Sequence, residues 1–169
     1  TVTNLNDSGA GSFRDAVSVP NRTVVFAVGG IIRITSRIAV QPNITIAGQT
    51  APGGGITIYG NGISFSNASN SIVRYMRFRQ GIGGDSGTDA VGIASGSNMI
   101  FDHVSASWGR DETFSVTSTA SNITLQDCIV GQGLLIHSAG GLMEPSGPVS
   151  VFRSLYADNW MRNPKVKGT

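Results

Sequence analysis

The sequence predicts an all-β protein built as a right-handed parallel β-helix, a solenoid of stacked coils, with a short capping helix near the N-terminus. Three observations support this prediction. A segment that begins with asparagine recurs along the chain, apolar and polar residues alternate within each copy, and 23 glycines accompany only 13% charged residues in 169 positions. This composition is typical of short strands and tight turns, and it disfavours helices with charged faces.

The N-terminal part differs from the repeats and is expected to close one end of the solenoid. Residues Ser12 to Val17 predict a short helix, and a strand is expected in the apolar stretch from Val24 to Ile32 that follows. A terminal coil needs such a cap, because its apolar interior would otherwise contact water.

The repeat itself follows the cap. It occurs as "NITIAG" at Asn43, "NSIVRYMRF" at Asn70, "NMIFDHVSA" at Asn98 and "NITLQDCIV" at Asn122, and the asparagines are 27, 28 and 24 residues apart. A fifth segment, "GPVSVFRSLYA" from Gly147, falls about one period later. Repeats of this length with short strands indicate stacked coils, whereas sandwich strands recur every ~8 to 12 residues. The asparagines are expected to be structural, with stacked amides bonded to each other.

Alignment of the copies places two columns of side chains on the outside of the coils. The first column holds Arg74, Asp102, Gln126 and Phe152, and the second holds Tyr75, His103, Asp127 and Arg153. Since a solenoid extends a polar face in one dimension, an elongated polymer could lie along it.

Composition excludes several function classes. The net charge is +2 and the basic residues form no run, so no nucleic-acid partner is expected. The longest apolar stretch has nine residues, far below the ~20 that span a bilayer, so no membrane insertion is expected. The single cysteine, Cys128, is expected to be buried without a disulfide. Five N-x-S/T sequons favour a secreted, extracellular protein; they begin at Asn6, Asn21, Asn43, Asn67 and Asn122.

Acidic residues gather in the middle of the chain. Half of the ten lie within 28 residues, namely Asp85, Asp89, Asp102, Asp111 and Glu112. Oxygen ligands on neighbouring coils suit Ca²⁺, although the same aspartates could simply form turns and a surface ion pair. Neither histidine has a nucleophile motif beside it; His103 reads as a structural residue, while His137 could face a groove.

Basic residues gather at the end of the sequence, where Lys165 and Lys167 are the only lysines and Arg162 precedes them. The segments "FDHVSASWGRDETFSV", "GQGLLIHSAGGLM" and "LYADNWMRNPKVKG", together with "NITIAGQTAPGGGITI", resemble the pectate lyase family of parallel β-helix polysaccharide lyases. The resemblance implies calcium-dependent cleavage of polygalacturonate by β-elimination. It assigns Arg162 as the base that removes the C5 proton and Lys167 to substrate binding, with Lys165 and His137 beside it.

The same resemblance assigns Asp89 and Asp111 to calcium binding, and Glu112 is expected to compensate as a ligand for a family aspartate that is missing here. Two positions depart from the family pattern, since Ser115 replaces an aspartate and Ala139 replaces a helper lysine. Two alternatives therefore stay open: a pectin lyase that acts on methylated pectin without calcium, against which the acidic residues argue, and a non-catalytic β-helix that binds polysaccharide.

The end of the sequence leads to one more expectation. Residues 1–169 predict one β-helix domain, and no cap follows Pro164. The apolar interior of the last coil, assigned to residues such as Val151 and Leu155, would then be open to water. We therefore expect this domain to be the N-terminal part of a longer solenoid, completed by a further C-terminal segment or by a second chain.

Overall fold

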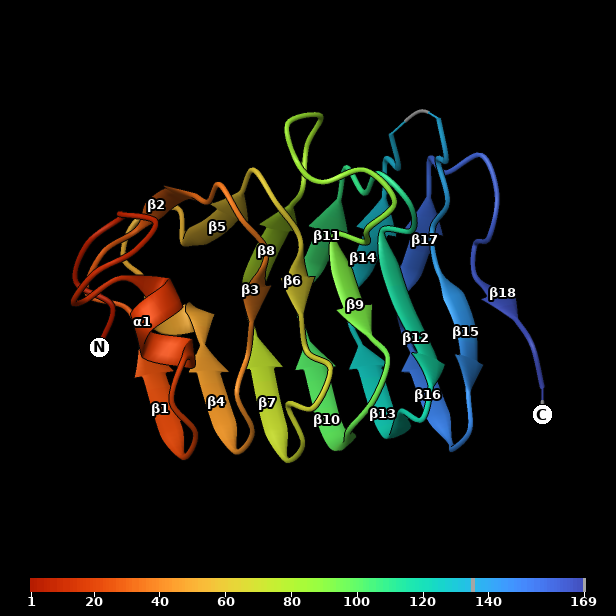
Figure 1. The fold of residues 1–169 in the computed structure, drawn as a ribbon, viewed down its shortest axis with the longest axis horizontal. Helices are drawn as coiled ribbons and strands as arrows, with labels where there is room; N and C mark the ends of the chain where they lie inside the picture. Colours follow the sequence, from red (N-terminus) through yellow and green to blue (C-terminus); the bar gives the residue numbers. More distant parts are fainter. Residues whose placement is uncertain (135, 169) are drawn as a thin grey trace.

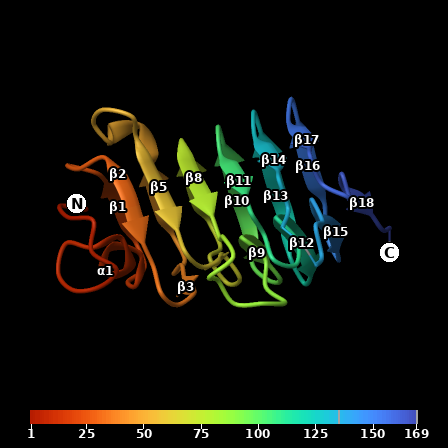
Figure 2. The ribbon, with the colours of Figure 1, turned by 90° about the horizontal axis from the view of Figure 1, so that it is seen from above.

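The computed structural model describes residues 1–134 and 136–168 and is a parallel β-helix (Figure 1). The described residues form three sheets of six strands, and strands that are neighbours in a sheet are three apart in chain order. Each turn of the chain therefore adds one strand to every sheet, and the coils stack in a row (Figure 2). The strand pairs are parallel, so the predicted parallel β-helix is confirmed.

The strands are short and follow one another in a fixed cycle. The first sheet contains β1 (Arg22–Val25), β4 (Ile44–Ala47), β7 (Ser71–Arg74), β10 (Ser97–Asp102), β13 (Ser121–Gln126) and β16 (Val149–Phe152). The second contains β2 (Gly30–Arg33), β5 (Ile56–Tyr59), β8 (Met76–Arg79), β11 (Ser105–Ser107), β14 (Ile129–Gly131) and β17 (Leu155–Ala157). The third contains β3 (Ile38–Ala39), β6 (Ile63–Ser64), β9 (Val91–Ile93), β12 (Phe114–Ser118), β15 (Leu142–Pro145) and β18 (Lys165–Val166).

The core runs along the axis of the solenoid as columns of aligned apolar side chains. In the first sheet, Val73 pairs with Phe101 and Phe101 with Leu125, and all three side chains are fully buried. Phe101 also packs edge-on against Phe65 and Phe114, with ring centroids 4.9 and 5.1 Å apart. Each coil thus buries its inward face against the coils before and after it.

A ladder of asparagines marks the turn before the first sheet. Five asparagines at equivalent positions have φ between 54° and 63°, namely Asn21, Asn43, Asn70, Asn98 and Asn122. The side-chain amide of each of the last four donates to the side-chain oxygen of the asparagine one coil earlier, over 2.8 to 3.0 Å. The predicted structural role of the repeated asparagines is confirmed, because this residue type tolerates the left-handed conformation and completes the ladder.

The N-terminal cap contains the helix α1 (Phe13–Val17), and the 3₁₀ turn η1 (Gly48–Thr50) follows on the second coil. Ser12 caps α1, since its hydroxyl accepts a hydrogen bond of 3.2 Å from the Asp15 amide. Phe13 and Val17 are fully buried, so the helix covers the first coil, as predicted. Within the described ranges, no helix has the length and hydrophobicity needed to cross a membrane.

The last described coil exposes apolar side chains at the opposite end. Val151 pairs with the core residue Leu125 and so points inward, yet it is 42% exposed. Leu155 pairs with Ile129, which is also exposed, and therefore points outward. Its assignment to the interior was wrong by one residue, because the inward neighbour is Tyr156. The expected continuation of the solenoid stays a prediction, and Thr169 lies outside the described residues.

Substitution Asn98→Ala should lower the stability of the fold by about 2 kcal/mol. It removes two amide ladder bonds, each worth about 1 kcal/mol, and alanine tolerates the left-handed conformation less well than asparagine does. Chemical denaturation measured by far-ultraviolet circular dichroism would give the loss.

Two control variants separate the causes. Asn98→Gly keeps the backbone conformation free of strain and should be less destabilised than Asn98→Ala. Asn21→Ala, at the end of the ladder, removes one bond only and should lose less as well. Equal stabilities for Asn98→Ala and the unaltered protein would show that the ladder does not support the fold.

Candidate active site

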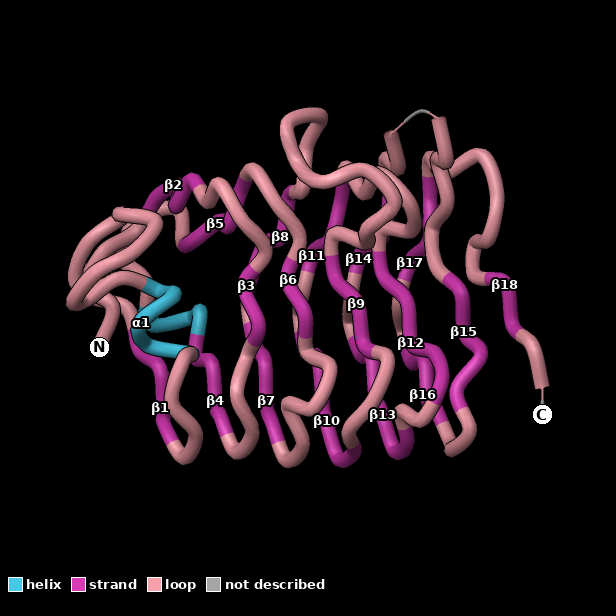
Figure 3. The backbone as a smooth tube through the Cα atoms, viewed as in Figure 1, coloured by secondary structure: helices cyan, strands magenta, loops and turns pink. Residues whose placement is uncertain are grey.

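Apart from the two lysines, the residues that the sequence assigned to the site come from the loops between the second and third sheets. Asp89 precedes β9, Asp111 and Glu112 precede β12, His137 precedes β15, and Arg162 precedes β18. These loops lie along one edge of the solenoid, at the top of Figure 3. Residues up to 73 positions apart in sequence are thereby brought to one corner of successive coils.

Isolated bridges align the loops with one another. Glu112 pairs with Ala139, and Ala139 pairs with Met161, both in parallel. Arg162 directly follows Met161 and therefore lies on the coil two turns after Glu112. The buried Ala139, where the resemblance implies a lysine, lies between them and contributes no charge.

Glu112 is the buried centre of this corner. Its carboxylate forms an ion pair with the guanidinium of Arg162, a close charge contact without regular hydrogen-bond geometry. Nε2 of His137 lies 3.9 Å from Oε1 of Glu112. Both atoms are buried; Oε1 is held by the ion pair with Arg162, whereas no described residue forms a hydrogen bond with Nε2. Because buried polar atoms rarely lack a partner, Nε2 of His137 marks a place where a polar ligand fits.

Asp111 completes a group that could hold a metal ion. Its Oδ1 lies 3.4 Å from Nε2 of His137, and ligand atoms of Asp111, Glu112 and His137 all lie within 4.8 Å of one another. Carboxylate oxygens suit hard cations, whereas an imidazole nitrogen is a poorer ligand for them. The donor set is therefore compatible with a metal bound mainly through its carboxylates.

Asp89 adjoins this group from the preceding coil. Its Oδ1 accepts a hydrogen bond of 3.2 Å from the Glu112 amide. Burial raises the pKa of Asp89 to about 7, and the charge of Asp111 adds to this, while Arg37, Arg162 and His137 oppose it. Without a bound cation, Asp89 therefore exchanges its proton near neutral pH.

Arg37 belongs to this corner, although no motif or repeat in the sequence pointed to it. It precedes β3 on the first full coil, and its positive charge favours the ionised form of Asp89. Its side chain lines a cavity of about 480 Å³ together with Asp89. Only its alignment with later coils could have revealed it.

The two lysines lie on the last described strand and its continuation. Lys165 opens β18, where it pairs with Leu142, and its side chain is exposed. Nζ of Lys167 forms an ion pair of 2.8 Å with Glu144 on the preceding coil. Both side chains are therefore exposed, and Lys167 already has a carboxylate partner.

Ser115 does not join the acidic group. It is buried on β12, and its hydroxyl accepts a hydrogen bond of 3.1 Å from the Leu142 amide. A serine at this position links two coils of the third sheet, so Asp89, Asp111 and Glu112 remain the carboxylates of this corner.

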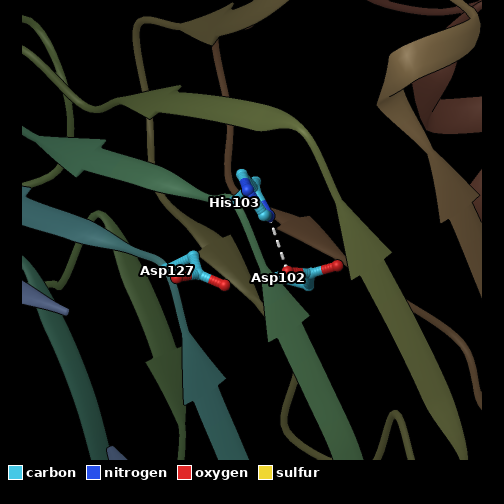
Figure 4. A group of neighbouring side chains, drawn as sticks. All are labelled: Asp102, His103 and Asp127. Atoms are coloured by element: carbon cyan, nitrogen blue, oxygen red, sulfur yellow. Dashed lines mark hydrogen bonds and ion pairs between the residues drawn. The ribbon is translucent and has the colours of Figure 1, made fainter. Parts of the chain in front are cut away.

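The two predicted columns of outward side chains, which include Asp102 and His103, do form. They lie at another corner of the coils than the site described above, between the first and second sheets (Figure 4). Asp102 accepts 2.7 Å bonds from Nε of Arg74 and Nδ1 of His103, which confirms a structural role for His103. Asp127 binds Arg153 through two bonds, and these hold its pKa below the usual value. Asp102, His103 and Asp127 lie close enough to share a metal ion, but their carboxylates already have partners. This group stabilises the stacking of coils.

Known proteins resemble the chain in sequence and in fold. A probable pectate lyase C of Aspergillus flavus is 67% identical over 167 residues, and one of Aspergillus fumigatus is 68% identical over the same number; each match covers 99% of this chain and 40% of the relative. The chain thus spans about two fifths of the length of these curated relatives. No family model matches it.

A solved structure supports the fold. The crystal structure of Jun a 1, the major allergen from cedar pollen, superposes with a TM-score of 0.63 at 16% identity, over 92% of this chain and 57% of the allergen. At this identity the likeness concerns the fold alone. The sequence relatives go further and confirm the resemblance that the motifs indicated: over nearly its whole length, this chain is a homologue of proteins named pectate lyase C.

Proposed function

We propose that the chain carries the catalytic corner of a pectate lyase, an enzyme that cleaves polygalacturonate by β-elimination. The observation that carries the proposal is the contact of Arg162 with the buried Glu112, beside Asp111 and His137. A basic group and several carboxylates converge there from separate coils. The identity of 67 to 68% with proteins named pectate lyase C supports the same activity.

The reaction needs a base and a stabilised negative charge. The base removes the proton from C5 of a galacturonate, and the electron pair of that C–H bond forms the double bond between C4 and C5. The bond from C4 to the glycosidic oxygen breaks, and this oxygen keeps the bonding pair and takes a proton from water. Because C5 lies next to the carboxylate, negative charge develops there, and nearby cations lower the barrier.

Arg162 is the proposed base. Free arginine has a pKa of ~12.5 or higher, so its neutral form is rare at neutral pH. In the structure the guanidinium is held by the ion pair with Glu112, so a cation would have to replace it there before it could face the substrate. Activity should therefore need alkaline solution and a competing cation at Glu112.

Calcium is the proposed cofactor, held by Asp111, Glu112 and Asp89. The buried carboxylate of Glu112 and the proximity of Asp111 support a bound cation at this corner. When bound, Ca²⁺ would neutralise the substrate carboxylate and so make the C5 proton more acidic. The imidazole of His137 is a poorer ligand for Ca²⁺ than a carboxylate is, so we assign His137 to hydrogen bonding with the sugar.

The surrounding residues would hold the polymer. Lys165 is exposed on the coil that also carries Arg162, and it is assigned to a substrate carboxylate. Lys167 could take the same role if the substrate displaces Glu144. Since a polysaccharide of this size does not pass through a cell membrane, we also propose that the protein acts outside the cell.

Substitution Arg162→Lys should lower lyase activity at least ~100-fold, because an ammonium group cannot reproduce the position and geometry of the guanidinium. The ultraviolet absorbance of the unsaturated product measures the activity. Arg153→Lys, which alters a surface ion pair, is the matched control and should stay close to the unaltered protein. Activity of Arg162→Lys within about tenfold of the parent would remove Arg162 from the role of base.

The variants Asp89→Asn and Asp111→Asn should each bind Ca²⁺ roughly tenfold more weakly while keeping the fold, since each removes one anionic ligand from a site with several. Calorimetric titration gives the affinities. Asp85→Asn, in an exposed loop, is the control. Unchanged affinity in both test variants would show that the ion binds elsewhere or does not bind.

Calcium affinity should rise between about pH 6 and about pH 8, because the pKa of Asp89 is about 7 and its protonated form is a weak ligand. Titrations at several pH values would measure this slope. In Asp89→Asn the slope should become shallower, since the group that loses the proton is absent. The same slope in both proteins would contradict the assignment of Asp89.

A further inference from the structure

Arg37 reaches the site from two coils away. Its backbone is fixed ahead of β3, where its carbonyl oxygen accepts a hydrogen bond of 3.2 Å from Arg14. Its guanidinium lies over Gly92 of β9, since a β-carbon placed on Gly92 would be 2.6 Å from Nη2 of Arg37. The same β-carbon would be 3.1 Å from Oδ2 of Asp89. Arg37 and Asp89 therefore flank the position that glycine leaves open.

Small side chains on the third sheet make this reach possible. Ala39 pairs with Ser64, and Ser64 pairs with Gly92 on the next coil. These small residues leave room on the outer face of the third sheet, so the side chain of Arg37 can lie along that face. A larger residue at Gly92 would have to displace the guanidinium.

The hydrogen-bonding capacity of Arg37 is left partly unused. Its Nε is buried, and no described residue accepts a hydrogen bond from it. No described carboxylate lies within ion-pair distance of its guanidinium. Asp89 is close enough to interact with Arg37 through its charge, but the two side chains do not form an ion pair. Buried donors of this kind normally have a partner, so a ligand is expected to supply the acceptor.

The cavity beside Arg37 suits an acidic sugar. Its lining includes the hydroxyl-bearing residues Ser64, Ser66 and Thr117 as well as Arg37 and Asp89. A guanidinium binds a carboxylate through two parallel hydrogen bonds, and hydroxyl side chains can bond the hydroxyls of a sugar ring. A methyl ester carries no negative charge and would lose most of this interaction.

We propose that Arg37 binds the carboxylate of a galacturonate unit other than the one that reacts, and that it makes the site prefer the de-esterified polymer. This inference rests on the proposed function and adds a specificity-determining residue to it. Arg37 lies on the opposite side of Asp89 from Arg162 along the solenoid, so the two arginines contact different units of one chain.

Binding of trigalacturonate and of its full methyl ester tests the proposal by calorimetry. All variants carry Arg162→Lys to prevent turnover, and calcium is present. Arg37→Gln should weaken trigalacturonate binding about tenfold and binding of the methyl ester less than about twofold. Gly92→Ala, which displaces the guanidinium, should act in the same direction. Arg33→Gln, whose exposed guanidinium lies over the Tyr59 ring on the second sheet, is the matched control.

Three results would overturn the proposal. The Arg37→Gln variant could bind trigalacturonate as tightly as the reference protein, which carries Arg162→Lys alone. It could also lose affinity for trigalacturonate and for the methyl ester by the same factor, which would indicate a structural role. The reference protein could also fail to bind trigalacturonate. Lyase activity of the unaltered protein on polygalacturonate is measured separately, so failure of the specificity role and failure of the proposed function are distinguishable.

Discussion

The in-register stacking of parallel coils is the constraint on which the rest of this structure depends. Side chains alternate between the two faces of a strand, so a slip of one residue would turn the core outward. The aligned apolar column that contains Phe101 and the asparagine ladder at Asn98 both oppose such a slip. Each loop therefore leaves its coil at a fixed height, which is how Glu112 and Arg162 meet.

This geometry places the opposite charges of Glu112 and Arg162 at a partly buried corner of the solenoid. A buried carboxylate such as Glu112 needs a cation, and Arg162 supplies one. The proposed chemistry requires the same guanidinium to leave Glu112 and face the substrate. Stability and activity thus make conflicting demands on one contact, and a cation that replaces Arg162 at Glu112 would satisfy both. At the same corner, burial and then the charge of Asp111 raise the pKa of Asp89.

Much of the fold could be predicted because it follows from local pattern. The repeat, the capped helix at Ser12 and the buried Cys128 all depend on neighbouring residues or on one period. The residues of the site were identified from the family resemblance, since the spacing of the acidic residues alone did not distinguish metal ligands from turn residues. Arg37 was missed because its position depends on the path of a long side chain across two coils. Leu155 was misplaced because one residue decides which face a strand position occupies.

Mass spectrometry of a polygalacturonate digest tests the central claim most directly, namely that this corner catalyses elimination. Elimination adds no water to the polymer, so each cleavage yields one fragment with an unsaturated end. This fragment is lighter by one water molecule than the saturated oligomer of the same length. The account predicts such unsaturated oligomers in the presence of calcium and their loss after chelation. A digest that contains only saturated oligomers would indicate hydrolysis, and an intact polymer would indicate binding without cleavage; either result would contradict it.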